Sequence, residues 1–105
     1  MSIAFLLDFY GEILSERKRN VLDMYYNEDL SLAEISDIIG ISRQGVRDMI
    51  KKSESELLFY EEKLGLAHRF GELRESADRI NALAEQFDLP DELIKEIQRL
   101  ATIAQ

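Results

Sequence analysis

The chain has no cysteine and no tryptophan, and it contains a single proline and a single histidine. Without cysteine it can form no disulfide, no thiol nucleophile and no cysteine-ligated zinc or iron–sulfur site. One histidine, His68, excludes a metal site made from two or three histidines of one chain. We therefore expect no metal and no other cofactor.

Long hydrophobic runs are also missing. The first apolar run, Ile3 to Leu7, stops at Asp8 and has no basic flank or cleavage site of a signal peptide. No run approaches the roughly 20 apolar residues that a membrane span requires. We expect no membrane insertion and a cytoplasmic location.

Positive charge is in deficit: 21 acidic residues face 13 lysines and arginines, which gives a formal charge of −8. Such a charge counts against non-specific binding to nucleic acid or to an anionic membrane. Hydrophobic residues make up 46% of the 105 residues and charged residues 32%, as in a folded globular chain. A chain of this length buries roughly two thirds of its unfolded surface, which is enough for one core.

Helical spacing dominates what is present. Apolar residues recur at i, i+3 and i+4, and no alternating strand pattern occurs. We predict an all-α fold of about five helices. The first is expected to run from Ile3 to Leu14 after the cap Ser2, with Gly11 inside it in close packing. A second is expected between the cap Ser15 and about residue 27.

Residues 31–52 have the pattern of a helix-turn-helix motif. Ser31 and Glu34 form the signature of a capping box at the start of a short apolar helix. Gly40 is expected to end this helix, because glycine adopts a left-handed conformation at little cost. Ser42 then caps the second helix of the motif.

That second helix, residues 43–52, offers polar side chains that suit DNA recognition. The N-terminal residues of such a helix reach base edges in the major groove, where arginine pairs with guanine and glutamine with adenine. A helix N-terminus also favours a phosphate. The candidate DNA-binding residues are Ser42, Arg43, Gln44, Arg47, Asp48 and Lys51. Additional candidate phosphate contacts are Lys18, Ser31 and Lys52.

The distribution of charge favours this segment. Residues 31–52 carry four basic and three acidic side chains, net +1, whereas residues 1–30 carry −3 and residues 53–105 carry −6. The acidic charge is concentrated away from the motif. The same two helices could instead serve as core packing or as a surface for another protein.

The sequence assigns no single role to three other residues: Tyr25, Tyr26 and Gly45. Tyr25 and Tyr26 fall on an apolar stripe, and we expect them in the core and at its rim rather than stacked on bases. Gly45 fits two interpretations: it lets the backbone approach a ligand, or it relieves a local clash.

At these residues the sequence resembles the YlxM-type family of bacterial helix-turn-helix proteins. The resemblance covers about residues 1–68 and is carried by DFYG (8–11), LDMYYNEDLSLAEI (22–35), GISRQGVRDMIKK (40–52) and YEEKLGL (60–66). It implies DNA binding by a motif like the sigma-factor region that reads the −35 promoter element. The residues that match this region are Ser31, Glu34, Ile35, Gly40, Ser42, Arg43, Val46 and Arg47. The family's genes lie beside those of the signal recognition particle, which implies regulation of that pathway.

Gly65 is a candidate C-cap. Beyond it the spacing becomes that of a heptad seam. The seam residues alternate steps of four and three: Leu66, Phe70, Leu73, Ala77, Ile80, Ala84 and Phe87. Pro90 is expected as the first residue of a last amphipathic helix. The seam fits either a hairpin with that helix, packed on the motif, or a dimer interface.

We expect a helix-turn-helix domain over residues 1–65, a helical tail over residues 66–105, and a homodimer, because most helix-turn-helix readers bind paired half-sites. The first functional hypothesis is a transcriptional regulator that binds double-stranded DNA. The second is a protein-interaction module that acts on signal recognition particle components without sequence-specific DNA binding. No pattern of catalytic residues stands out, and we expect no enzymatic activity.

Overall fold

The computed structural model describes residues 1–104, and every regular element among them is a helix. The predicted all-α class is confirmed. The described residues form two compact units, residues 1–65 and 66–104. No helix among the described residues is both long and apolar enough to cross a bilayer.

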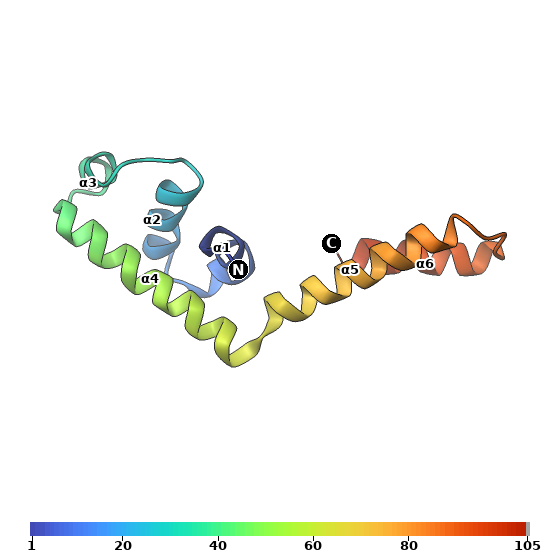
Figure 1. Cartoon of the computed structure of the whole chain (residues 1–105). Helices are drawn as coiled ribbons and strands as arrows, with labels where there is room; N and C mark the ends of the chain where they lie inside the picture. The colour runs from blue at the N-terminus through green and yellow to red at the C-terminus, as the bar shows by residue number, and fades with distance from the viewer. Residues whose placement is uncertain (105) are drawn as a thin grey trace. The chain divides into compact units, whose positions relative to one another are not determined.

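The first unit packs three short helices against one long helix, and a 3-10 turn joins the first two of them (Figure 1). The long helix, α4, contacts each of the three shorter ones. In chain order the elements are α1 (Ile3–Tyr10), η1 (Gly11–Ile13), α2 (Glu16–Tyr26), α3 (Leu32–Ile39) and α4 (Arg43–Leu64).

One face of α4 forms the centre of the core. Val46, Ile50 and Leu57 are buried on this face, and α1, α2 and α3 pack around them. Burying each such side chain contributes roughly 1.5–3 kcal/mol relative to leaving it exposed. The shorter helices contribute the buried residues Leu6, Leu7, Tyr10, Val21, Leu22 and Ile35.

The first helix is shorter than the sequence predicts. The α-helix ends at Tyr10, and Gly11 begins the tighter turn η1, in which the Leu14 amide donates to the Gly11 carbonyl at 3.1 Å. The predicted close packing at Gly11 is confirmed, because a Cβ there would lie 3.3 Å from Leu7 Cδ1. The packing therefore falls at a change of helix type, not inside one α-helix.

The predicted helix ends are confirmed where a side chain or a glycine makes them. The hydroxyl oxygens of Ser2, Ser15 and Ser42 accept hydrogen bonds from the third residue beyond each cap. Gly40 and Gly65 end α3 and α4 with φ values of 75° and 63°. These caps satisfy amides and carbonyls that a helix end leaves without partners.

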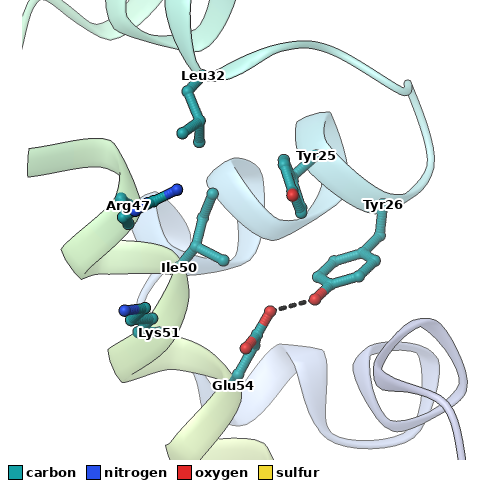
Figure 2. A pocket seen from close by; sticks show the side chains of 7 residues that line it. All are labelled: Tyr25, Tyr26, Leu32, Arg47, Ile50, Lys51 and Glu54. Carbon is teal, nitrogen blue, oxygen red and sulfur yellow. Dashed lines mark hydrogen bonds between the residues drawn. The ribbon is translucent and has the colours of Figure 1, made fainter. Parts of the chain in front are cut away.

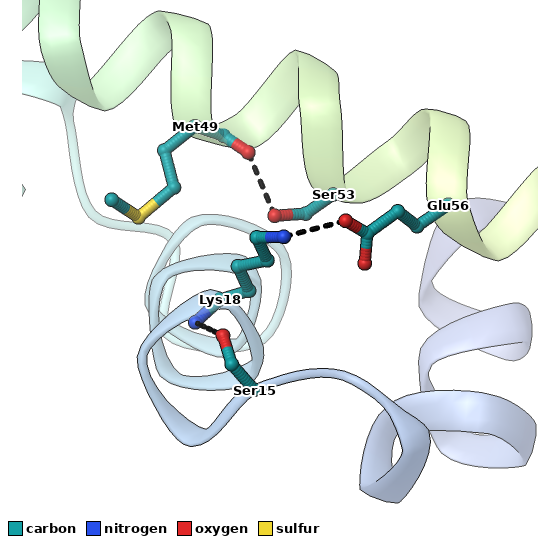
Figure 3. Close-up of polar contacts among 5 residues, drawn as sticks. All are labelled: Ser15, Lys18, Met49, Ser53 and Glu56. Atoms are coloured by element: carbon teal, nitrogen blue, oxygen red, sulfur yellow. Dashed lines mark hydrogen bonds and ion pairs between the residues drawn. The ribbon is translucent and has the colours of Figure 1, made fainter.

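Three carboxylates of α4 fasten it to other helices of the first unit. Tyr26 donates to Glu54, Lys18 Nζ pairs with Glu56 Oε1 at 2.5 Å, and Tyr10 donates to Glu61 Oε2 at 2.7 Å. Figure 3 shows the Lys18–Glu56 pair beside the buried Ser53, whose hydroxyl donates to the Met49 carbonyl. These contacts fix the orientation of α4 over its second half.

The second unit is a hairpin of α5 (Leu66–Ala84) and α6 (Asp91–Ile103). Ala77 and Ala104 are buried in the hairpin, and Ile94 and Ile97 are half-buried. Arg74 Nε reaches across to donate to the Ala104 carbonyl at 3.1 Å. The last helix does pair with α5 in a hairpin, but the hairpin does not bury the predicted seam. Ala77 is the buried seam residue, whereas the large seam residues are exposed: Leu66, Phe70, Leu73, Ile80 and Phe87.

Two predicted boundaries in this unit are wrong by a few residues. The seam was expected to continue in one helix to Phe87, but α5 ends at Ala84 and Phe87 lies in the following turn. Pro90 is the N-cap of α6 and not its first residue. Its φ of −58° suits a helix, but its extended ψ of 145° delays the helix until Asp91.

We expect Gly40→Ala to destabilise the first unit by about 1–2 kcal/mol, because the left-handed conformation strains any residue with a Cβ. Nothing lies within 4 Å of that Cβ, so crowding adds nothing to the cost. Urea unfolding followed by tyrosine fluorescence measures this unit alone, because all four tyrosines lie between residues 10 and 60.

The matched control is Gly40→Asn, because asparagine tolerates the left-handed region better than alanine. We expect the free energy of unfolding of Gly40→Asn to lie between those of the wild type and Gly40→Ala. Equal stability of the alanine variant and the wild type would contradict the assigned turn.

Candidate nucleic-acid interface

The turn between α3 and α4 is built by local contacts. Gly40 supplies the left-handed residue, and the hydroxyl of Ser36 donates to the carbonyl of Ile41 across the turn. A Cβ at Gly45 would lie 3.2 Å from Ser42 Oγ and 3.3 Å from Ile41 Cδ1. This crowding accounts for Gly45 without a ligand and supports the second of its two interpretations.

The geometry of α4 sorts the predicted residues into two rows. Residues four apart on an α-helix lie nearly above one another. Arg43, Arg47 and Lys51 form one row, and Gln44, Asp48 and Lys52 form the next. All six side chains are exposed. The first row lies beside the buried positions 46 and 50, whereas the second lies farther from the core.

Contacts within the motif occupy several of the predicted residues. Ser42 Oγ accepts from the Gly45 amide at 3.0 Å, and Gln44 Nε2 donates to Asp48 Oδ1 at 2.9 Å. Ser31 and Glu34 complete the predicted capping box, with both hydrogen bonds at 3.1 Å. The exposed Ser31 therefore marks the N-terminus of α3 with its oxygen already engaged.

Lys18, a candidate phosphate contact, does not lie with the candidate DNA-binding residues of α4. Its ammonium pairs with Glu56, and its side chain is only 25% exposed. Glu56 lies about two and a half helical turns beyond Arg47 on α4. The lysine contributes to the attachment of α2 to α4.

The cations of the two rows have no acidic partner. No ion pair within residues 1–104 involves Arg43, Arg47, Lys51 or Lys52. The neighbouring carboxylate of Asp48 is held by Gln44. The first three turns of α4 therefore present four positive charges to solvent on a chain whose net charge is −8.

Beside the first row lies a pocket of about 350 Å³ that sequence reasoning missed (Figure 2). Its lining residues come from three helices: Tyr25, Tyr26, Leu32, Arg47, Ile50, Lys51 and Glu54. Tyr25 is at the rim as expected, with 37% of its surface exposed. No signal in the sequence joins the two tyrosines to the cations, because the pocket exists only where α2 and α3 cross α4.

Tyr26 closes one end of the pocket. Its hydroxyl donates to Glu54, and its ring meets that of Tyr25 edge-on with 5.1 Å between centroids. Burial raises the pKa of Tyr26 well above its ordinary value, and the hydrogen bond to Glu54 raises it further. The hydroxyl thus remains a donor, because both causes oppose its ionisation.

Comparison with known proteins identifies the family. The chain matches, over residues 1–100, the family described as "Putative helix-turn-helix protein, YlxM / p13 like". The chain belongs to this YlxM/p13-like family. The match extends past the residues 1–68 of the predicted resemblance and includes most of the second unit.

Curated relatives carry the family name UPF0122 protein. The one from Thermoanaerobacter sp. (strain X514) is 41% identical over 102 residues, which cover 94% of this chain and 87% of the relative. That from Acetivibrio thermocellus is 40% identical over 100 residues, 95% of this chain and 86% of the relative. A Clostridium kluyveri protein is 56% identical over 64 residues, 61% of this chain and 58% of the relative.

Membership in the YlxM/p13-like family agrees with the observed geometry. The family description names a helix-turn-helix, and α3, the Gly40 turn and α4 form one. The motif lies wholly inside the matched residues 1–100.

We expect Tyr26→Phe and the wild type to show the same native phenolate absorbance near pH 10, where an ordinary tyrosine is half ionised, because the pKa of Tyr26 is raised. A spectrophotometric pH titration of both proteins measures this. When both proteins are unfolded in urea, all tyrosines ionise at alkaline pH. The phenolate absorbance of the wild type should then exceed that of the variant by one tyrosine of four.

The raised pKa of Tyr26 also makes the stability of the folded chain depend on pH. The folded chain holds the Tyr26 proton more tightly than the unfolded chain, whose tyrosine ionises near pH 10. The stabilisation is complete below about pH 10 and is lost as the pH rises further. If the phenolate absorbance of the native wild type exceeds that of native Tyr26→Phe by one tyrosine, the Tyr26–Glu54 contact is contradicted.

Proposed function

We propose that the protein is a DNA-binding transcriptional regulator that reads the major groove with the first three turns of α4. The observation that carries this proposal is the group of four exposed cations without acidic partners on the second helix of a helix-turn-helix. Local positive charge at this position supplies the phosphate attraction that DNA binding requires. The acidic remainder of the chain limits non-specific binding.

The two rows of α4 suggest a division of roles. Arg43, Gln44 and Arg47 lie in the first two turns, where base edges are within reach. Asp48 orients Gln44 through their hydrogen bond. The phosphate contacts come from Lys51 and Lys52, together with the helix ends capped by Ser42 and Ser31.

We further propose that the regulator acts as a homodimer through the second unit. A hairpin buries only one side of each helix. Here the exposed large residues recur every seventh position, at Leu66, Leu73 and Ile80 of α5 and at Leu93 and Leu100 of α6. This heptad period is that of helix bundles, so a second hairpin would complete a four-helix bundle.

A second candidate function is supported by the acidic charge. A protein-interaction module for signal recognition particle components would use the apolar and acidic surfaces of the second unit. We propose signal recognition particle genes as the regulated targets in the first case and its components as partners in the second. In neither case do we propose an enzymatic reaction.

We expect selection from a random duplex DNA library at low salt to enrich one motif with the wild type and none with Arg43→Ala/Arg47→Ala. Each arginine that contacts a base is worth about 1–3 kcal/mol. The matched control is Lys95→Ala/Arg99→Ala, which removes the same charge from α6. We expect this control to enrich the wild-type motif.

Two outcomes would contradict the proposal that Arg43 and Arg47 read bases. Failure of the wild type to enrich any sequence would favour the interaction module. Enrichment of the same motif by both double variants would show that other residues read the bases.

We expect sedimentation equilibrium to give twice the 12.2 kDa chain mass for the wild type, and the single mass for Leu73→Glu/Leu100→Glu. A buried unpaired carboxylate is costly, so the charges should separate the bundle. Ser76→Glu/Thr102→Glu adds the same charge at exposed positions outside the seam and should stay dimeric. A monomeric wild type would overturn the proposed bundle.

A further inference from the structure

We infer that the pocket between α2, α3 and α4 binds a small, ring-bearing anion that competes with DNA. The inference about binding stands on the pocket alone, whereas the competition rests on the proposed function. The ligand class is an aromatic carboxylate or a nucleoside monophosphate, since both join a flat ring to one anionic group.

The pocket has the composition of a ligand site. Such sites combine an apolar floor with a few converging polar groups and begin at about 300 Å³. Here Leu32 and Ile50 form apolar walls, and Arg47 and Lys51 stand at one side of a volume of about 350 Å³ (Figure 2). A volume of this size suits a single ring system with its substituents.

The polar groups at the mouth lack protein partners. Within residues 1–104, neither Arg47 nor Lys51 has an ion pair, and the hydroxyl of Tyr25 has no hydrogen bond. A guanidinium and an ammonium one turn apart can both donate to a single carboxylate or phosphate. The ring of Tyr25 offers a face or edge to an aromatic ligand.

Glu54, one turn beyond Lys51 on α4, limits the charge that a ligand can carry. Glu54 is a carboxylate, but it accepts the hydrogen bond of Tyr26, whose raised pKa keeps that donor in place. The lining therefore carries two positive charges and one negative charge, with Lys51 between Arg47 and Glu54 along α4. A ligand with its anionic group on Arg47 and Lys51 and an uncharged ring toward Tyr26 keeps its charge away from the Glu54 carboxylate.

Occupancy would alter the proposed DNA surface directly. Arg47 and Lys51 belong to the row that lies along the first three turns of α4. An anion held by both would neutralise two of the four cations. By linkage, DNA and ligand would weaken each other by the same factor.

The test uses the full-length, DNA-free protein, so it does not depend on DNA recognition. Two-dimensional NMR with labelled protein follows titration with adenosine monophosphate, guanosine monophosphate, salicylate and indoleacetate. Adenosine tests the ring without the anion, and inorganic phosphate tests the anion without the ring. We expect at least one ring-bearing anion to shift the Tyr25 and Ile50 signals and to bind more tightly than adenosine or phosphate.

The variants compare neighbouring cations. Lys51→Ala should lower the affinity for the ring-bearing anion by about tenfold, because a charge-assisted hydrogen bond is lost. Lys52→Ala removes the same charge one residue away, outside the pocket, and should change binding by less than about twofold. Tyr25→Ala should weaken the ring-bearing anions but not inorganic phosphate.

Three results would overturn the inference: no member of the panel binds, binding shifts signals elsewhere, or Lys51→Ala and Lys52→Ala weaken it equally. If no anion binds but Tyr25→Ala lowers DNA affinity, the pocket holds the DNA backbone instead. Binding of the anion to a protein that selects no DNA motif would leave the site standing and refute only the proposed function.

Discussion

The first unit depends on the burial of one face of α4. Val46, Ile50 and Leu57 lie at the centre of the core, and three other helices pack on them. Because the helix is continuous from Arg43 to Leu64, burying this face determines where every other side chain on it points. The two rows of polar residues in its first three turns are exposed for that reason.

The polar contacts of α4 change character along the helix. Its first three turns hold cations with no acidic partner. Its later turns hold Glu54, Glu56 and Glu61, each bonded to a side chain of α1 or α2. Within the described residues, the cations at one end of the helix are thus unpaired, whereas the carboxylates at the other end hold the unit together. The division suits a helix that must be rigidly placed and still meet a ligand.

The second unit leaves many of its large apolar side chains exposed. Ala77 and Ala104 are buried between α5 and α6, and Ile94 and Ile97 are half-buried there. A two-helix hairpin offers each helix only one neighbour, and Leu73, Ile80 and Leu100 stay exposed on its outer faces. The sequence pattern therefore exceeds what a single hairpin can bury, which is the physical basis for proposing a second copy.

The sequence by itself determined the local features. Serine caps, the capping box of Ser31 and Glu34, and the ends at Gly40 and Gly65 depend on residues within about one helical turn, so they were predictable. The exposure of Arg43, Gln44 and Arg47 also followed from helical spacing. Tertiary structure alone decided the pairing of Lys18 with Glu56, the turn at Gly11 and the pocket that joins Tyr25 to Arg47. These features depend on how helices cross, and crossing geometry is set by the packing of many side chains at once.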